Sequence, residues 1–275
     1  MEQALLEISD DIAPQVACPA SLNWRCFSEN SKDIYQSADP WPHLVVDGLF
    51  DPELVKQAEA EETSAAHQLP LRHSRRRLKA SSSQPAGSAA RGILAALISD
   101  AMVGFLRQLT EIDTLVADPS FYWAGIHATP PGGYQTLHTD FRRQPITRLF
   151  HRVNILLYLN SDWPESYGGH LELYTRQMHC TKRVLPTAGR AVIFETSSET
   201  CHAVAQAIGA PDGKWRLALS SFYYATSHAP DDRRRKIIRK PKRPEDPWHM
   251  GFGTPPAAIA NLRQLLAGVP NLRLR

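Results

Sequence analysis

The chain has 275 residues, of which 43% are hydrophobic and 21% charged, a composition that excludes general disorder and fits one large globular domain. No apolar run approaches the ~18 residues of a membrane-spanning helix, and the first 18 residues carry four acids instead of a signal-peptide pattern. The sequence therefore predicts no membrane association and a cytoplasmic location. The four cysteines form no C-x-x-C pair, which argues against a thiolate zinc site and against a disulfide framework.

The net charge of +3 is unevenly distributed along the chain. Two basic runs, residues 72–79 and 233–243, hold 13 of the 31 Lys and Arg residues, so the remainder has 18 cations against 28 acids and a net charge of −10. Such runs are most often solvated loops, but they also form lids over anionic ligands and contacts to nucleic acid.

The N-terminal part shows few clear elements. Residues 1–38 have no sustained periodicity and are predicted to form an irregular leader. Leu44-Val-Val predicts a short strand that ends in a turn. A helix then begins with Asp51 as N-cap and Pro52 at its first position.

The next part is predicted to support the core. Residues 67–91 combine the first basic run with Ser, Gly and Pro, which predicts a mobile surface loop. Apolar side chains recur at helical spacing from Gly92 to Leu109 and predict a second helix. Residues 51–110 are thus expected to form a helical support.

From residue 121 onward, short apolar strands alternate with Gly, Pro, Asn and Asp clusters. The predicted strands are Phe121–His127, Tyr134–Phe141, Val153–Leu159, His170–Tyr174, Val184–Leu185, Ala191–Glu195, Cys201–Val204 and Trp215–Tyr224. Eight short strands fit a double-stranded β-helix, or jelly roll, in which alternate side chains point into a cavity. We therefore expect a mainly β fold with flanking helices.

The predicted domain organisation follows from these elements. One domain spans residues 39–227, with its jelly-roll core at 121–227. A basic C-terminal extension, residues 228–275, follows it, with a helix expected at 255–267.

A potential metal site lies in the β region. His138 and Asp140 are separated by one residue in a predicted strand, so both side chains point to the same face. His202 follows 62 residues after Asp140 on another predicted strand. Two histidines and one carboxylate form the facial ligand set that suits non-haem iron(II) and leaves three coordination positions open. Alone, H-x-D is a weak motif in a chain with 11 histidines.

Arg216 strengthens the metal hypothesis. It lies 14 residues after His202 in an apolar strand, where an alternating arginine faces either solvent or the cavity. Its planar guanidinium pairs bidentately with carboxylates, so it is a candidate partner for the distal carboxylate of a 2-oxo dicarboxylic acid.

Seven segments, in order, resemble the 2-oxoglutarate- and iron(II)-dependent oxygenases of the prolyl-4-hydroxylase-like superfamily, in the branch with the ribosomal-protein prolyl hydroxylases. The resemblance spans roughly residues 38–227. The segments are Trp41-Pro-His-Leu-Val-Val-Asp, Leu137-His-Thr-Asp-Phe, Arg152-Val-Asn-Ile-Leu-Leu-Tyr-Leu-Asn, Tyr167-Gly-Gly-His-Leu-Glu-Leu-Tyr, Gly189-Arg-Ala-Val-Ile-Phe-Glu, Cys201-His-Ala-Val and Trp215-Arg-Leu-Ala-Leu. One departure is the spacing from His202 to Arg216, which is longer than usual in the family.

The resemblance implies a role for each matching residue. Iron(II) would be bound by His138, Asp140 and His202, and 2-oxoglutarate by a salt bridge from Arg216 and a hydrogen bond from Tyr158. Asn154 shares the strand face of Tyr158 and is assigned to the same pocket. The implied activity is a dioxygenase that uses O2 and 2-oxoglutarate to hydroxylate or otherwise oxidise a C–H bond, releasing succinate and CO2, with ascorbate as a stimulant.

The substrate stays open among amino-acid-like, peptidyl and natural-product compounds. Contacts to it are expected from Arg142 and Arg143 after the metal strand and from the loop arginines Arg75, Arg76 and Arg77. Two alternatives remain: a cupin-type jelly roll that binds another metal without 2-oxoglutarate, and a nucleic-acid demethylase whose arginine runs grip phosphates. The sequence favours neither a nucleic-acid partner nor any particular oligomeric state.

Overall fold

The computed structural model describes residues 22–74 and 77–229. The chain divides into two compact units, Met1–Lys240 and Pro241–Arg275, and every described residue belongs to the first. Arg75, Arg76, most of the predicted leader and nearly all of the predicted C-terminal extension, including its helix, lie outside the described residues. The domain limits at residues 38 and 227 therefore stay predictions.

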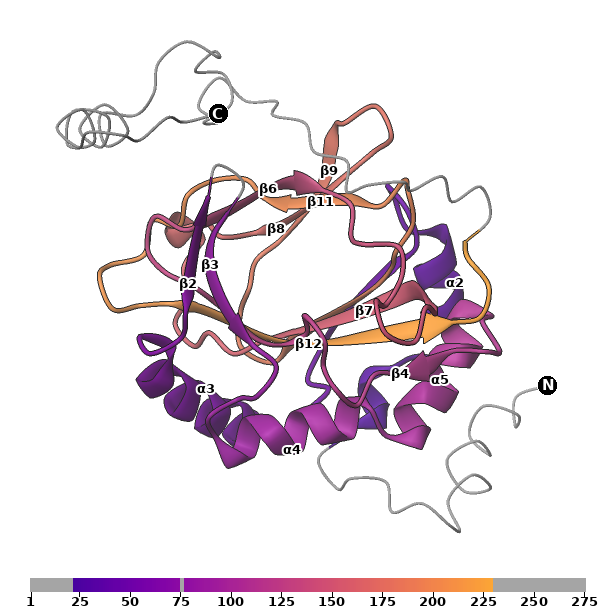
Figure 1. The fold of residues 1–275 in the computed structure, drawn as a ribbon, viewed down its shortest axis with the longest axis horizontal. Coiled ribbons are helices and arrows are strands. Elements are labelled where there is room, and N and C mark those ends of the chain that lie inside the picture. Colours follow the sequence, from indigo (N-terminus) through magenta and orange to yellow (C-terminus); the bar gives the residue numbers. More distant parts are fainter. Residues whose placement is uncertain (1–21, 75–76, 230–275) are drawn as a thin grey trace, which may run out of the picture. The chain divides into compact units, whose positions relative to one another are not determined.

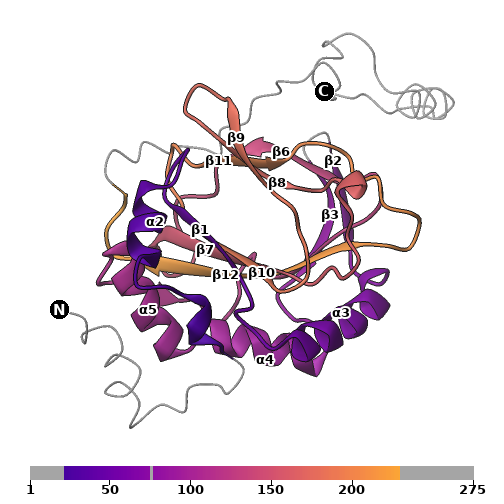
Figure 2. The same cartoon turned by 180° about the vertical axis from the view of Figure 1, so that it is seen from behind.

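The described residues fold around one curled sheet in which all named strands pair antiparallel (Figures 1 and 2). Its order is β1-β10-β7-β12-β5-β3-β6-β11-β8-β9, with β2 beside β3 and β4 beside β12. The strands are β1 His43–Asp47, β2 Leu71–Ser74, β3 Arg77–Ser82, β4 Val116–Ala117, β5 Gly125–Thr129, β6 Tyr134–His138, β7 Phe150–Tyr158, β8 Leu171–Tyr174, β9 Cys180–Val184, β10 Arg190–Glu195, β11 Cys201–Val204 and β12 Arg216–Ala225.

The sheet curls until its two halves face each other, which confirms the predicted jelly roll. We call β1, β10, β7, β12 and β5 the major half, and β6, β11, β8 and β9 the minor half. Figure 1 shows β6, β11 and β8 lying across from β7 and β12. Side chains on the inner faces of both halves therefore meet in the space between them.

Four α-helices accompany the sheet: α2 Ser31–Ser37, α3 Pro52–Ala66, α4 Ser88–Leu97 and α5 Asp100–Thr110, with short 3-10 turns η1 Trp24–Cys26 and η2 Glu165–Tyr167. In Figure 1, α3, α4 and α5 cover the outer face of the major half. Their buried side chains form one core with the outward-facing residues of β7 and β12, among them Ile93, Leu106, Ile155 and Leu219. This close-packed core holds the strands of the major half in place, so the side chains on their inner face have fixed positions.

Two details of the helical part differ between sequence and structure. The helix after Asp51 begins as predicted, because the Asp51 carboxylate accepts hydrogen bonds from the Glu53 and Leu54 amides. The single helix expected at residues 92–109 is instead α4 and α5, because the Ser99 hydroxyl accepts from the Met102 amide and caps a new helix. Residues 1–38 were expected to be irregular or partly helical, and their described part contains α2, whose Tyr35 is buried.

Among the described residues, no single helix is long and apolar enough to cross a membrane. The bent pair α4 and α5 reaches that length and composition only when the two helices are taken together.

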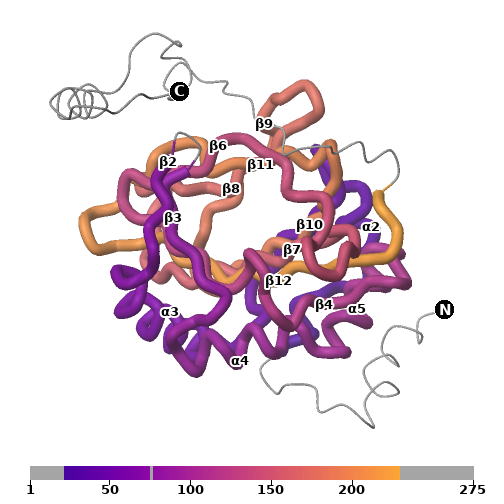
Figure 3. The backbone as a smooth tube through the Cα atoms, in the orientation of Figure 1, coloured from indigo at the N-terminus to yellow at the C-terminus, as the bar shows by residue number. Residues whose placement is uncertain are grey.

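The predicted mobile loop at residues 67–91 is wrong over its central part. Residues Leu71–Ser74 and Arg77–Ser82 form the hairpin β2–β3, and the edge of β3 opposite β2 pairs with β6 near Arg77 and with β5 from Ala80 to Ser82. Figure 3 traces β3 between the two halves of the sheet. Its basic composition was misleading, because the cations occupy only one face while Ala80, on the other face, is fully buried in the core.

Replacing Ala80 by Leu tests whether this hairpin is part of the folded core. A larger side chain at a fully buried position forces its neighbours apart, which typically costs about 1–3 kcal/mol of unfolding free energy. Urea denaturation should show this loss for Ala80→Leu. Leu71→Ala, which changes the half-exposed cross-strand neighbour of Ala80, should change stability much less. Equal stability of Ala80→Leu and the wild type would mean that the hairpin does not pack.

Candidate metal and co-substrate site

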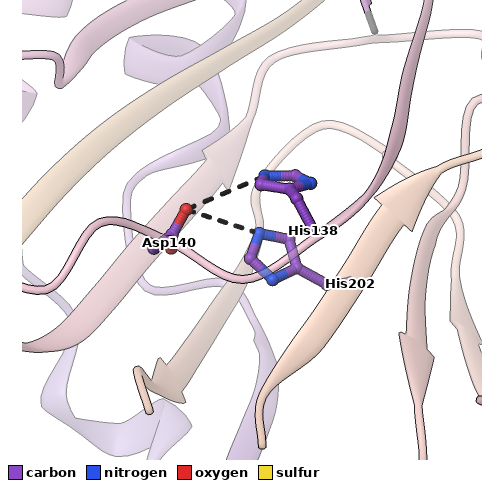
Figure 4. Close-up of side chains that lie close together, drawn as sticks. All are labelled: His138, Asp140 and His202. Atoms are coloured by element: carbon purple, nitrogen blue, oxygen red, sulfur yellow. Dashed lines mark ion pairs between the residues drawn. The ribbon is translucent and has the colours of Figure 1, made fainter. Parts of the chain in front are cut away.

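The side chains of His138, Asp140 and His202 point toward one another near the end of β6 (Figure 4). His138 ends β6, and His202 lies directly opposite it on β11. Asp140 follows two residues after the end of β6, so it does not belong to the strand Tyr134–Phe141 that the sequence predicts. The chain leaves the ladder there, and this turns the carboxylate toward both histidines.

The spacing of the donor atoms fits a single metal ion. Asp140 Oδ1 lies 3.8 Å from Nε2 of His138 and 3.8 Å from Nε2 of His202. The ligand atoms of the three residues all lie within 4.8 Å of one another. Metal–donor bonds of about 2.1 Å allow ligand atoms up to ~4.2 Å apart, so the Asp140 contacts match two ligands of the same ion. Two imidazoles and one carboxylate are the donor set expected for non-haem iron(II).

Backbone carbonyls orient both histidines. His138 Nδ1 lies 2.8 Å from the Thr136 carbonyl, and His202 Nδ1 lies 3.2 Å from the Thr200 carbonyl. With a proton on Nδ1, each ring donates to its carbonyl and keeps the lone pair of Nε2 for the metal. The ligand set is therefore held in the tautomers that coordination requires.

Asn154 holds the carboxylate ligand. Its Nδ2 donates a 2.6 Å hydrogen bond to Asp140 Oδ2, and its Oδ1 accepts from His151 Nε2 at 2.5 Å. The sequence assigns Asn154 to the co-substrate pocket, but the structure places it against a metal ligand. With Oδ2 occupied by this bond, Oδ1 is the oxygen that faces both histidines.

The charges of the site favour a divalent cation. Burial and, after it, the neighbouring His202 lower the pKa of His138 to about 3, so His138 is neutral near pH 7. Burial alone would raise the pKa of Asp140. The adjacent His202, His151 and His138 and the Asn154 hydrogen bond outweigh burial and hold that pKa well below its usual value. Metal ligation needs this combination of neutral imidazole and ionised carboxylate.

Arg216 and Tyr158 lie on the inner face of the major half. Arg216 is 5% exposed and Tyr158 is fully buried. The guanidinium carbon lies 4.9 Å from the centre of the Tyr158 ring, and Nε donates to the Gly169 carbonyl at 2.6 Å. No carboxylate among the described residues forms an ion pair with Arg216. The Tyr158 hydroxyl is buried without a hydrogen bond of ordinary geometry.

This pair fits the distal carboxylate of 2-oxoglutarate. A buried cation without a partner carries a large desolvation cost, and burial indeed lowers the pKa of Arg216. An anionic ligand would relieve that cost, and the Tyr158 hydroxyl would donate a second hydrogen bond to it. Both residues therefore lie where the sequence places the co-substrate.

Gly169 makes room for Arg216. Its φ of +70° is a conformation that L side chains rarely adopt, and a Cβ there would lie 3.1 Å from Arg216 Cδ. The Gly-Gly turn thus does more than permit a tight bend, because its carbonyl and its missing side chain fix the position of the guanidinium.

The arginines predicted to contact substrate lie in different places. Arg142 and Arg143 stack over the Phe150 ring, at 5.2 Å and 4.1 Å from its centre. Arg77 is half-buried on β3 and pairs with Gln135 of β6. Arg75 and Arg76 are not among the described residues.

Two residues near the metal site, His127 and Gln135, escape the sequence analysis, and Lys79 enters it only as part of the basic run 72–79. His127 lies on β5, its Nε2 is 3.2 Å from the Trp123 carbonyl, and burial and then Lys79 lower its pKa to about 3. Gln135 Nε2 donates to His138 Nε2 at 2.8 Å, because an irregularity between β6 and β11 turns both side chains to one face. The same Nε2 lone pair would bind the metal, so metal ligation would replace this hydrogen bond. Simple strand alternation would place Gln135 and His138 on opposite faces.

We predict that Asn154→Ala weakens iron(II) binding about 10–100-fold, because Asp140 loses the hydrogen bond that orients it. His138→Ala, Asp140→Ala and His202→Ala should abolish tight binding, since each removes a ligand. Anaerobic isothermal titration calorimetry measures both effects. Asn30→Ala, which removes an exposed Asn without a side-chain cap bond, is the control and should bind iron(II) like the wild type. Unchanged affinity in Asn154→Ala would mean that Asp140 is oriented by other contacts.

The comparisons with known proteins agree with this geometry. Residues 124–224, which include all three proposed metal ligands and Arg216, match the model of the 2OG-Fe(II) oxygenase superfamily. A curated relative, prolyl 3-hydroxylase OGFOD1 of Xenopus laevis, is 30% identical over 102 residues, which cover 34% of this chain and 20% of that protein. The chain thus aligns with only about a fifth of the length of this relative.

Solved structures support the fold. A prolyl-4-hydroxylase of Pseudomonas putida aligns with a TM-score of 0.52 at 21% identity, covering 71% of this chain and 97% of that one. A Trichoplax adhaerens prolyl hydroxylase in complex with a hypoxia inducible factor peptide fragment aligns at 0.50 and 14% identity, covering 71% and 87%. Residues 124–224 are thus similar to the 2OG-Fe(II) oxygenase superfamily, the fold is like that of prolyl hydroxylases, and the three converging side chains of His138, Asp140 and His202 could hold a metal ion.

Proposed function

We propose that this protein is a 2-oxoglutarate-dependent iron(II) dioxygenase that hydroxylates a C–H bond of a peptidyl substrate. The observation that carries the proposal is the buried Arg216, which has no carboxylate partner among the described residues and lies on the inner face of the sheet that also carries His138, Asp140 and His202. A metal site alone fits many jelly-roll proteins. The buried cation adds a site for the far end of a dicarboxylate.

The reaction would consume the substrate, 2-oxoglutarate and O2 and yield hydroxylated substrate, succinate and CO2. Iron(II) with its co-substrate supplies the oxidising power, and the protein supplies binding and orientation. His138, Asp140 and His202 would bind one face of the ion and leave the opposite face for co-substrate and O2. Arg216 and Tyr158 would fix the distal carboxylate and so orient the co-substrate toward the metal.

The peptidyl substrate is the finer part of the proposal. It is supported by the relative, which is described as a prolyl 3-hydroxylase. A prolyl side chain in a peptide is therefore the first substrate to test.

Neither alternative from the sequence accounts for the site as well. A cupin-type metal protein without 2-oxoglutarate has no use for a buried unpaired guanidinium, which would only destabilise it. A nucleic-acid demethylase needs cations on an accessible phosphate-binding surface. Among the described surface cations, Arg190 pairs with Asp47 and Arg176 with Glu199, so part of the positive surface charge is neutralised within the protein.

The activity itself is tested by succinate formation. Protein loaded anaerobically with iron(II) and then given O2, 2-oxoglutarate, ascorbate and a library of proline-containing peptides should form succinate and peptides that are ~16 Da heavier, the mass of one oxygen atom. His138→Ala should form neither. Without succinate formation in the wild type under any substrate, the proposed activity would have to be abandoned.

Arg216→Ala should raise the 2-oxoglutarate KM at least about thirtyfold, which corresponds to about 2 kcal/mol for a lost charge-assisted bidentate pair in a closed site. Arg216→Lys should recover part of the loss, because it restores the charge without the planar fork. Iron(II) affinity should stay the same in both. Arg190→Ala is the matched control: Arg190 is engaged by Asp47 at 2.8 and 2.9 Å, so its loss should leave the KM unchanged. If Arg190→Ala raised the 2-oxoglutarate KM and Arg216→Ala left it unchanged, the co-substrate carboxylate would be assigned to Arg190.

A further inference from the structure

The β2–β3 hairpin carries a row of cations on one face. Arg72 lies opposite Lys79, and Ser74 lies opposite Arg77, so these side chains share a face. The other face carries Ala80, which is fully buried in the core that the helices form with the major half. Because successive residues of a strand alternate, the face with Arg72, Arg77 and Lys79, here called the hairpin cation face, turns away from that core.

The register of the sheet turns this face toward the space between the two halves; Arg77 and Lys79 are half-buried there, whereas Arg72 is exposed. Ser81, on the face of Lys79, lies opposite His127 of β5, and the next residue of β5 on that face, Thr129, lies opposite Arg216 of β12. Further along the same edge of β3, Arg77 lies opposite Gln135, whose amide reaches His138. The hairpin cation face therefore approaches the strand of the co-substrate cation toward the Ser82 end of β3 and the proposed metal ligands toward its Arg77 end.

These cations have no counter-ions. None of Arg72, Arg77 and Lys79 forms an ion pair with a carboxylate in the part of the chain that the structure describes. Burial and the neighbouring Arg77 lower the pKa of Lys79 to about 8, while Asp140 favours its charged form. Burial and then Arg72 lower the pKa of Arg77 as well. Repulsion between the cations and their partial loss of water are unfavourable, and an anion bound between them would offset both.

The co-substrate does not supply that anion. Of its two carboxylates, one would lie at the metal beside the 2-oxo group and the other at Arg216, so both are already accounted for. The substrate is the remaining ligand of this cavity. Its negative charge would have to lie next to the residue that is oxidised, because Arg77 lies opposite Gln135, whose amide reaches the proposed metal ligand His138.

We propose that the hairpin cation face, Arg72, Arg77 and Lys79, binds a carboxylate or phosphate group next to the oxidised residue, so that the enzyme selects acidic peptide segments. This inference rests on the proposed function for the identity of the ligand as substrate. Lys79 and Arg77 would be specificity-determining residues, and neither would take part in the oxidation.

Selection from a peptide library tests this proposal without turnover. Immobilised full-length protein, loaded with nickel(II) in place of iron(II) and with 2-oxoglutarate, would be exposed to peptides with a central proline and randomised neighbours. Retained peptides should be enriched at least about fivefold in Asp, Glu or phosphoserine at one or two neighbouring positions. Libraries with and without phosphoserine distinguish carboxylate from phosphate as the preferred group.

Single-residue variants test whether the hairpin cation face, and not the net charge of the protein, selects acidic peptides. Lys79→Gln and Arg77→Gln should each remove most of the enrichment and leave the affinity for 2-oxoglutarate unchanged. Lys56→Gln removes one positive charge from the exposed face of α3, far along the chain from the hairpin, and should keep the enrichment. Thermal denaturation of each variant shows whether it is folded.

Three results would overturn the proposal. The first is retention of peptides without any preference for acidic residues. The second is a preference that survives in Lys79→Gln and Arg77→Gln, or that Lys56→Gln weakens equally, since net charge would then explain it. The third is a large loss of 2-oxoglutarate affinity in Lys79→Gln, which would make Lys79 a second co-substrate cation. If the earlier assay gave no succinate, the proposed activity would be rejected, but the peptide-binding result would still stand or fall by itself, because it is measured without turnover.

Discussion

The two halves of the curled sheet must be held at a fixed separation, because each contributes a different part of the site. The histidines come from β6 and β11 of the minor half, whereas Arg216 and Tyr158 come from β12 and β7 of the major half. Two connections across the cavity maintain this separation. Strand β3 pairs with both halves, and the Asn154–Asp140 hydrogen bond joins β7 to the loop after β6. A substitution in β3 or at Asn154 would therefore alter the distance between the proposed metal site and Arg216 without replacing any of the three proposed metal ligands.

Much of the site could be predicted from the sequence, because its residues belong to elements with strong local signals. The β11 strand has the predicted limits, and β7, β10 and β12 lie within one to three residues of theirs. On such strands, alternation alone places His202, Tyr158 and Arg216 on inner faces. Asp140 and His138 were predicted to face one site, and they do so although Asp140 lies outside β6, because two residues only one position apart remain close in space after the strand ends.

The residues that sequence reasoning missed depend on contacts that no local pattern encodes. Asn154 was assigned to the right face, but its bond to Asp140 depends on how the loop after β6 returns toward β7. Gln135 faces the metal only because of an irregularity in strand pairing. The hairpin was predicted to be a mobile loop because a row of cations normally indicates a solvated segment, whereas here β3 pairs with β5 and β6 and buries Ala80 on its other face.

The position of Asp140 outside the ladder makes the three ligands unequal. Both histidines are part of paired strands and are hydrogen-bonded to the backbone two residues before them, so replacing either one disturbs a polar network inside the sheet. Asp140 is attached to the rest of the site only through its carboxylate. A small residue at this position would leave the strands intact and free one coordination position for an external anion. Asp140 is therefore the proposed ligand whose replacement would change the metal site while disturbing the fold least.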